Sequence, residues 1–146
     1  DITTDTLTLE AWIYFDETSL EAGDYDLTKS HVLFDKSAGD NSTTNYMLVL
    51  GNDGRLHLQN YSGFVTHEIS SETVLEEGQW HHIAMVYNAS NPSATPTVTF
   101  YVDAAPEDPQ EWEAGPTDTD DLLIGKSQLG YNFKGLIDDL VDQITT

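Results

Sequence analysis

The sequence predicts an all-β protein built as an antiparallel β-sandwich, and two patterns carry this prediction. Several short segments alternate apolar and polar residues, which is the period of a strand with one buried face. Clusters of Gly, Asn, Asp and Pro separate these segments, as turns between antiparallel strands do, and no segment keeps a helical period. With 146 residues the chain can bury one sizeable core, so we expect a single domain over residues 1–146. Because the chain begins at Asp1 without Met, we also expect this domain to be excised from a longer protein.

The first predicted strand runs from Thr6 to Asp16, where side chains of two faces alternate strictly. Its core face consists of Leu7, Leu9, Ala11, Ile13 and Phe15. An acidic loop over residues 16–29 follows, which is too long for a hairpin turn. A short strand over residues 31–35 then leads into a polar turn over residues 37–44.

The clearest hairpin in the chain comes next. Residues 46–50 and 56–60 are its predicted strands, and Gly51-Asn52-Asp53-Gly54 is the turn sequence between them. Further short strands are predicted over residues 64–69 and 73–75.

Residues 78–87 form the predicted central strand. Both of its faces are largely apolar, which is typical of a strand covered on each side, and Gly78 supplies the turn that leads into it. His81 and His82 are adjacent, so their side chains point to opposite faces and cannot readily chelate one metal ion. We therefore expect His81 to be a hydrogen-bonded packing histidine.

The remaining segments repeat this succession of strands and turns. They are a polar loop (88–96), an alternating strand (97–103), a long acidic loop with prolines (104–121) and two last strands (122–125 and 133–141). Short strands in this arrangement favour two antiparallel sheets packed face to face.

The composition excludes several classes of partner. The chain has 26 acidic and 5 basic side chains, a formal charge of −21, so we expect no binding to nucleic acid, whose phosphates need Lys and Arg. No apolar run is long enough to cross a bilayer, so we expect no membrane insertion. High salt or bound divalent cations would relieve the repulsion among carboxylates, which suits a marine, halophilic or calcium-rich extracellular setting. A soluble acidic surface with no specific metal accounts for the charge equally well.

Six segments of the chain match, in order, the motifs of one known family. They are Thr8-Leu9-Glu10-Ala11-Trp12-Ile13, Asn52-Asp53-Gly54-Arg55-Leu56, Gly78-Gln79-Trp80-His81-His82-Ile83-Ala84, Phe100-Tyr101-Val102-Asp103, Leu123-Ile124-Gly125 and Phe133-Lys134-Gly135-Leu136-Ile137-Asp138-Asp139-Leu140. Together they resemble the laminin-G-like branch of the concanavalin A-like lectin/glucanase family, which includes the pentraxins. Ala104 departs from the pattern, because the family normally has Gly at this position.

The resemblance implies a concanavalin A-like jelly roll and a non-catalytic module that binds carbohydrate or protein, often with calcium. We therefore expect a carbohydrate-binding or adhesion module of an extracellular or cell-surface multidomain protein. The alternative is a structural or spacer domain, or a protein-interaction domain without a glycan ligand, whose acidity confers salt tolerance. The sequence leaves the oligomeric state open.

The sequence lacks the acidic motif of the catalytic relatives. Relatives that hydrolyse β-glucans carry two glutamates flanking an aspartate on one strand, which places the carboxylates on one face. The segment from Glu68 to Glu72 has no central aspartate, and Glu111-Trp112-Glu113 lies in a Pro-rich loop. No Ser lies in a nucleophile-elbow context either. We therefore expect a protein that is not an enzyme.

Two places are candidates for calcium. The resemblance to pentraxins implies Asp40 and Asn41 as ligands, with Gln128 from a later loop as a further oxygen donor. Asp40 or Asn41 could instead cap the backbone of a polar turn. Asp138 is the second candidate, because many lectin-like sandwiches hold calcium where the first and last strands meet, and there it could join Asp5 or backbone oxygens. Asp138 could equally be a solvated strand residue.

Carbohydrate binding needs aromatic side chains and hydrogen-bonding groups in a shallow cleft. Trp12 and Tyr14 share the non-core face of the first predicted strand, and Tyr101 points away from the core face of its own strand. These three rings could instead cover the other sheet or lie under a loop. Trp112 and Tyr131 lie in predicted loops, where we expect exposed rings to meet a ligand.

Overall fold

The structure is a computed structural model, and it describes residues 5–16, 23–38, 43–62, 65–115 and 119–145. A single 3-10 turn, η1 (Leu27–Lys29), and a series of strands make up its regular elements in these ranges. The strands are β1 (Thr6–Tyr14), β2 (His31–Ser37), β3 (Thr43–Leu50), β4 (Leu56–Ser62), β5 (Val65–Ser70), β6 (Trp80–Asn88), β7 (Thr97–Val102), β8 (Ala105–Pro106), β9 (Gln110–Glu111), β10 (Leu123–Ile124) and β11 (Leu136–Thr145).

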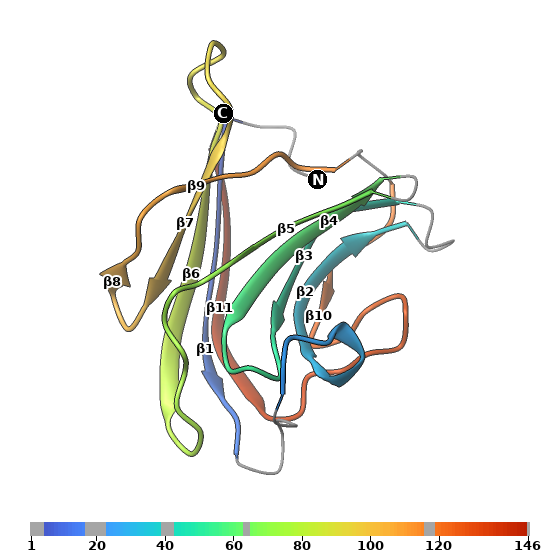
Figure 1. The fold of residues 1–146 in the computed structure, drawn as a ribbon, viewed down its shortest axis with the longest axis vertical. Helices are drawn as coiled ribbons and strands as arrows, with labels where there is room; N and C mark the ends of the chain where they lie inside the picture. Colours follow the sequence, from blue (N-terminus) through green and yellow to red (C-terminus); the bar gives the residue numbers. More distant parts are fainter. Residues whose placement is uncertain (1–4, 17–22, 39–42, 63–64, 116–118, 146) are drawn as a thin grey trace.

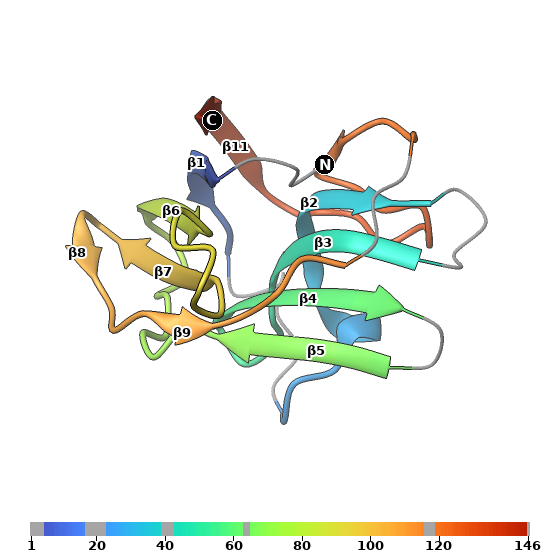
Figure 2. The same ribbon diagram turned by 90° about the horizontal axis from the view of Figure 1, so that it is seen from above.

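The strands form two antiparallel sheets that face each other, as Figures 1 and 2 show. Sheet A has the order β11-β1-β6-β7-β8, with β9 also paired to β7, and sheet B has the order β10-β2-β3-β4-β5. The predicted all-β sandwich with jelly-roll strands is confirmed. The predicted central strand β6 lies inside sheet A, between β1 and β7.

Alternation along the strands builds the core between the sheets. Sheet A contributes the face of β1 that the sequence predicts, together with Ile83, Met85 and Phe100, and all of these side chains are buried. Sheet B contributes side chains such as Leu48 and Leu58 from β3 and β4. Because the inward side chains of both sheets belong to this one cluster, the core joins the two sheets into one body.

Sheet B differs from sheet A because its central strands are buried on both faces. Every residue of β2 is buried, and so are most residues of β3 and β4. On the outer face, Val32, Met47 and Val49 form a second apolar cluster, which Tyr25, Leu27 and Tyr131 cover in part. The covering side chains come from the segment between β1 and β2 and from the loop between β10 and β11.

The outer face of β6 is more open than its composition predicts. Trp80 is 43% exposed, and His82 and Val86 are only half-buried. The expectation of a strand covered on both sides is therefore wrong for β6.

One predicted strand and the start of another are also wrong. Residues 73–75 form no strand, because the backbone N–H groups of Glu72 and Thr73 donate to the Glu107 carboxylate instead of to a neighbouring strand. The last strand begins at Leu136 rather than at residue 133. At Gly135 the backbone passes so close to Tyr14 that a Cβ atom would lie 2.1 Å from its carbonyl oxygen.

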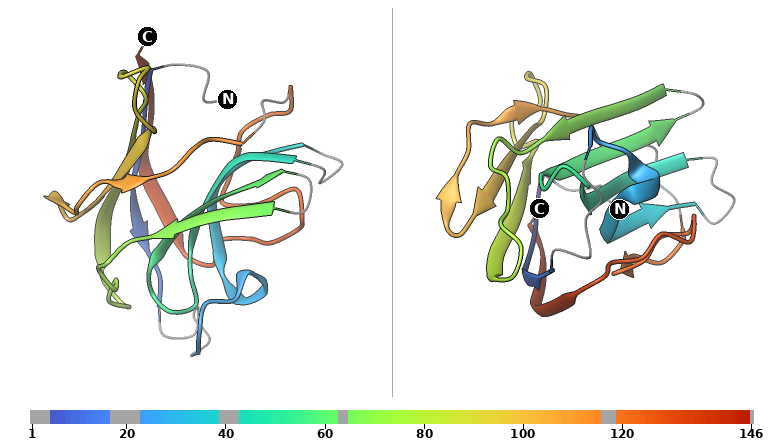
Figure 3. Two further views of the ribbon diagram at one scale, coloured as in Figure 1. Left: turned by 45° about the horizontal axis from the view of Figure 1, so that its top comes forward. Right: turned by 60° about the horizontal axis from the view of Figure 1, so that its bottom comes forward.

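The segment over residues 110–115 crosses from sheet A to sheet B (Figure 3). It pairs with β7 at one end, and at the other end the Gly115 carbonyl accepts a bond from the Asn45 side chain. Trp112 in its middle turns inward and packs edge-to-face against Tyr87 in the core. This crossing segment closes one side of the sandwich.

Candidate functional site

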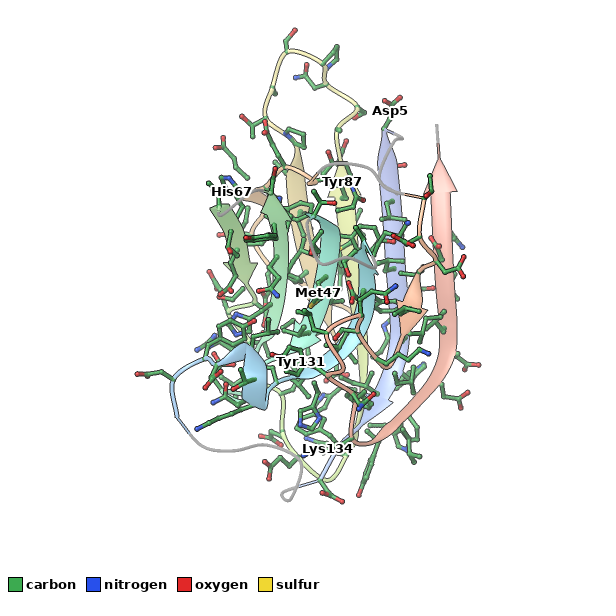
Figure 4. The ribbon with its side chains drawn as sticks, turned by 90° about the vertical axis from the view of Figure 1, so that its right-hand side faces the viewer. Asp5, Met47, His67, Tyr87, Tyr131 and Lys134 are labelled. Atoms are coloured by element: carbon green, nitrogen blue, oxygen red, sulfur yellow. The ribbon has the colours of Figure 1, made fainter. Side chains whose placement is uncertain are left out.

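A groove of about 270 Å³ lies on the outer face of sheet B. Figure 4 looks onto this face, with Met47 in the middle of the sheet and Tyr131 below it. The groove is lined by Leu27, Ser37, Thr44, Met47, Gln59, Asn60, Tyr61, Thr66 and Leu129. Leu27 comes from the β1–β2 segment and Leu129 from the β10–β11 loop, so two connections flank a floor made by β2, β3, β4 and β5.

The floor of the groove follows from strand alternation and register. Met47 lies opposite both Asp35 and Gln59, and Tyr61 lies opposite Thr66, so the outward side chains of four strands lie in rows. Their inward neighbours, such as Leu48 and Leu58, belong to the core. The same two-residue period that builds the core therefore also lines the groove.

Among the residues that the structure describes, no charged side chain lines the groove. This is notable in a chain with 26 acidic and 5 basic side chains. Asp35 and Glu68 lie opposite the lining residues Met47 and Gln59, and both carboxylates make other contacts. Asp35 Oδ2 accepts from the Gln128 N–H, and Glu68 Oε1 lies 3.1 Å from His57 Nδ1. The groove is therefore an uncharged surface within an acidic molecule.

Two polar groups in the groove are weakly satisfied. The Ser37 side chain is buried, and its Oγ has no hydrogen-bond partner among the described residues. In the described part of the chain, Gln59 Nε2 donates only to the Met47 sulfur, at 3.5 Å. A thioether is a weak acceptor, so the Gln59 amide keeps most of its capacity to donate. The Ser37 hydroxyl keeps its capacity both to donate and to accept.

Aromatic stacking and polar contacts hold one wall of the groove. The Tyr25 ring stacks on the imidazole of His57, with centroids 3.7 Å apart and planes 10° apart, and the Tyr25 hydroxyl donates to Gln59 Oε1 at 3.3 Å. His57 lies between two carboxylates, with Nε2 3.0 Å from Asp53 Oδ1 and Nδ1 3.1 Å from Glu68 Oε1. Burial, and after it the nearby carboxylates, raises the pKa of Tyr25.

Asn52 connects the same wall to the β3–β4 hairpin through two hydrogen bonds. Its Oδ1 accepts from the Asp26 N–H at 2.7 Å, and its Nδ2 donates to the Asp24 carbonyl at 2.9 Å. Asp26 in turn caps η1 by accepting from the Thr28 N–H. The predicted turn sequence of the hairpin thus also positions the wall that carries Leu27.

A larger cleft of about 590 Å³ lies beside the free edge of β5. It is lined in part by His67, Glu111, Trp112 and Glu113, so it is more acidic than the groove. Side chains bond the edge of β5 here: Trp112 Nε1 donates to the His67 carbonyl and Gln110 Nε2 donates to the Ser70 carbonyl. These bonds indicate that this side of the sheet is closed by structural contacts.

The structure places the two predicted loop aromatics differently. Trp112 does lie in an irregular segment, but it is 3% exposed, so the expectation that it is exposed is wrong. Its indole is long enough to reach the core from a segment that crosses the edge of the sandwich. Tyr131 is half-buried beside the second apolar cluster, next to the groove wall. Its role in ligand binding stays a prediction.

The predicted strand aromatics lie on the outer face of sheet A, away from the groove. Trp12 is 40% exposed and its ring centroid lies 5.3 Å from that of His82, while Tyr14 lies 5.8 Å from Trp80. Tyr101 is on the same face, opposite Ala84. The sequence interpretation missed Trp80 as a member of this group, although its alternation with His81 places it outward. That Trp12, Tyr14 and Tyr101 contact a ligand stays a prediction.

The residues predicted to hold calcium do not converge among the described residues. Asp40 and Asn41 lie outside the described residues. Gln128 is in the loop beside sheet B, whereas Asp138 is in sheet A opposite Trp12.

Asp138 and Asp5 cannot share an ion either. Asp138 pairs with Trp12, and Asp5 precedes β1, so at about 3.4 Å per residue they lie roughly 24 Å apart along the sheet. The described part of the chain contains no group of three or more His, Cys, Asp or Glu side chains that could hold a metal ion.

His81 is the packing histidine that the sequence predicts. It is buried, its Nδ1 lies 2.8 Å from Asp103 Oδ2, and its Nε2 accepts from the Glu76 N–H at 3.2 Å. The other oxygen of Asp103 accepts from the His82 N–H at 2.9 Å. The motif that marks the central strand therefore serves to join it to the β7–β8 turn.

Comparison with known proteins identifies the family. The model of the "Concanavalin A-like lectin/glucanases superfamily" matches residues 1–141. The chain belongs to this superfamily. A search of curated proteins gave no match.

Two solved structures show the same concanavalin A-like fold at low identity. Domains LG4-5 of the mouse laminin alpha1 chain match with a TM-score of 0.64 and 14% identity, over 97% of this chain and 36% of that one. The native heptameric SAP-like pentraxin from Limulus polyphemus matches with a TM-score of 0.56 and 17% identity, over 98% of this chain and 66% of that one. The chain thus spans about a third of the laminin fragment and just under two thirds of the pentraxin. None of the described residues forms a helix that could span a membrane.

Proposed function

We propose that the protein is a non-catalytic carbohydrate-binding module of an extracellular or cell-surface protein, and that the groove on sheet B holds the sugar. The observation that carries the proposal is the groove itself: apolar walls from two connections enclose a floor of hydroxyl and amide side chains. Small-ligand sites commonly combine apolar walls with a few well-placed polar groups. Membership of a lectin-fold superfamily supports the same function.

A glycan panel tests the proposal. Neutral glucan, galactan and mannan oligosaccharides, together with galacturonan and sulfated glycans, are presented to the protein with calcium and with a chelator. We expect binding to at least one glycan. Absence of binding to every member, combined with tight binding to an extracellular protein, would favour a protein-interaction domain instead.

A matched pair of variants locates the site. Thr66→Trp places a large ring in the groove from an exposed position of β5, whereas Thr99→Trp makes the same change on the outer face of sheet A. We expect Thr66→Trp to abolish glycan binding and Thr99→Trp to preserve it. The opposite result would move the site to the face that carries Trp12, Tyr14 and Tyr101.

The same panel tests the absence of catalysis. We expect no hydrolysis products after prolonged incubation, because no strand of the described residues presents the acidic triplet of the glucan-hydrolysing relatives. Reducing ends released from any glycan would contradict this part of the proposal.

A further inference from the structure

We infer that the groove selects uncharged sugars and that Ser37 and Gln59 determine this selectivity. The inference rests on the proposed function and names the class of sugar that the site takes. Two properties of the groove carry it: the absence of charge among its described lining residues, and its two weakly satisfied polar groups.

The lack of charge in the lining argues against an anionic sugar. A carboxylate or sulfate that leaves water needs a cation or several N–H donors in the site, because an unpaired buried charge is costly. None of the lining residues is Lys, Arg or His. Lys29 and Lys134 line a separate hollow with Tyr131, and Lys36, next to Ser37, donates to the Asp120 carbonyl. The acidic remainder of the chain would add repulsion.

The lack of carboxylates in the lining argues against a cationic ligand or a metal-bridged one. Asp35 and Glu68, which belong to the same outward rows, are bonded to Gln128 and His57 respectively. A calcium ion requires several oxygen ligands, usually with carboxylates among them. Apart from Leu27 and Leu129, the described lining of the groove provides hydroxyl, amide and thioether groups.

The polar groups present suit the hydroxyls of a neutral sugar. The Ser37 hydroxyl can both donate and accept, and Gln59 Nε2 can donate to an oxygen better than to the Met47 sulfur. A sugar hydroxyl can likewise donate and accept, so it can bond to either side chain without any charge. A buried hydroxyl left without a partner is unfavourable, so a bound sugar that supplies the bond gains affinity.

A pair of matched ligands tests the selectivity. Each neutral oligosaccharide that binds is compared with its C6-oxidised uronate, which keeps the stereochemistry and adds carboxylates. Calorimetry at about 0.1 M and about 1 M NaCl separates the groove from the charge of the whole molecule, because long-range repulsion is screened at high salt. We expect the uronate to bind at least about tenfold more weakly at both salt concentrations. Equal binding, or recovery of uronate binding at high salt, would overturn the inference.

Matched variants test the two residues. Ser37→Ala removes the hydroxyl, and Gln59→Glu keeps the acceptor for Tyr25 but adds a charge. We expect the first to weaken neutral-sugar binding about three- to tenfold and the second more than about tenfold. Ser93→Ala in the exposed β6–β7 loop and Gln143→Glu on β11 are the controls, and both should bind as the unmodified protein does. Thermal melting confirms that each variant is folded.

The outcomes separate the inference from the proposed function. If neutral sugars bind and Thr66→Trp abolishes binding, but Ser37→Ala and Gln59→Glu have no effect, the inference is wrong and the proposed function stands. If no sugar binds the unmodified protein, both are wrong. If sugar binding survives Thr66→Trp, the site is not this groove and the inference falls with it.

Discussion

Ala104 occupies a backbone conformation that its side chain disfavours. Asp103 and Ala104 form the turn between β7 and β8, with φ of 51° and 66°. Asp tolerates this left-handed region, whereas Ala is penalised there by about 1–2 kcal/mol. We expect Ala104→Gly to raise the free energy of unfolding by about 0.5–1 kcal/mol, after the entropy that Gly adds to the unfolded chain. Urea denaturation measures this change.

Ala105→Gly provides the matched control for that prediction. Ala105 is also exposed, but it lies in β8 and is not among the residues with positive φ. Gly in a strand only adds flexibility, so we expect a loss of about 0.5–1 kcal/mol there. If both substitutions changed stability in the same direction, backbone strain at Ala104 would not explain the result.

Tyr25 makes the stability of the fold sensitive to alkaline pH. Burial and the carboxylates of Glu68, Asp53 and Asp26 raise its pKa in the folded protein, so the fold favours the protonated phenol. The contribution of the protonated Tyr25 phenol to stability is complete below about pH 10, the pKa of Tyr in the unfolded chain. This contribution is lost as the pH rises above that value toward the raised pKa of the folded protein. We expect the melting temperature to fall between about pH 9 and pH 11.

Tyr25→Phe is the variant that tests this pH dependence. Phe can keep the ring contact with His57 but cannot ionise, so the fall should be smaller in the variant. A residual fall is expected, because burial and Glu113 also raise the pKa of Tyr87. A variant whose melting temperature fell as steeply as that of the unmodified protein would rule out Tyr25 as the cause.

At the scale of elements, the crossing segment protects the free edge of β5. Trp112 and Gln110 donate to the carbonyls of His67 and Ser70, which an unpaired edge strand would otherwise expose. We expect Trp112→Phe to lower the free energy of unfolding by about 1–3 kcal/mol through lost packing and the lost bond. Glycan binding should stay unchanged in this variant. A selective loss of binding at full stability would instead support the ligand role predicted for Trp112.

The elements themselves were predictable where one face of a strand is buried and the other is not. The alternation in β1 and β7 marks their core faces correctly. In sheet B, β2 and β3 are buried on both faces, so no alternation along these strands distinguishes the groove from the core. The segment that covers them contributes single residues, such as Tyr25 and Leu27, whose contacts no local pattern specifies.

At the scale of the whole molecule, the charge of −21 dominates the response to salt. Repulsion among exposed carboxylates disfavours the compact state, and salt shortens its range from about 10 Å at 0.1 M to about 3 Å at 1 M. We expect the melting temperature to rise over this range of NaCl concentration. A flat profile would mean that local pairings already offset the repulsion.

Calcium chloride at matched ionic strength is the comparison that detects a specific ion site. A rise in melting temperature at micromolar calcium would reveal such a site, because a ligand that binds only the folded state stabilises it by mass action. The variant Asp40→Ala would then show whether the site includes the pair Asp40 and Asn41. The variant Asp138→Ala would show in the same way whether the second candidate, on sheet A opposite Trp12, holds the ion.

The sequence by itself determined the class of fold, the core faces of the long strands and the packing role of His81, because these depend on a two-residue period and on local hydrogen bonds. The tertiary structure alone decided that Trp112 is buried, that Asp138 on sheet A and Gln128 in the loop beside sheet B lie apart, and that the described lining of the groove is uncharged. The groove joins residues from four strands and two connections, among them Leu27, Gln59 and Leu129. These residues come together because of the order of the strands in sheet B and the packing of two connections over it. Both depend on contacts between distant parts of the chain, so no short stretch of residues specifies them.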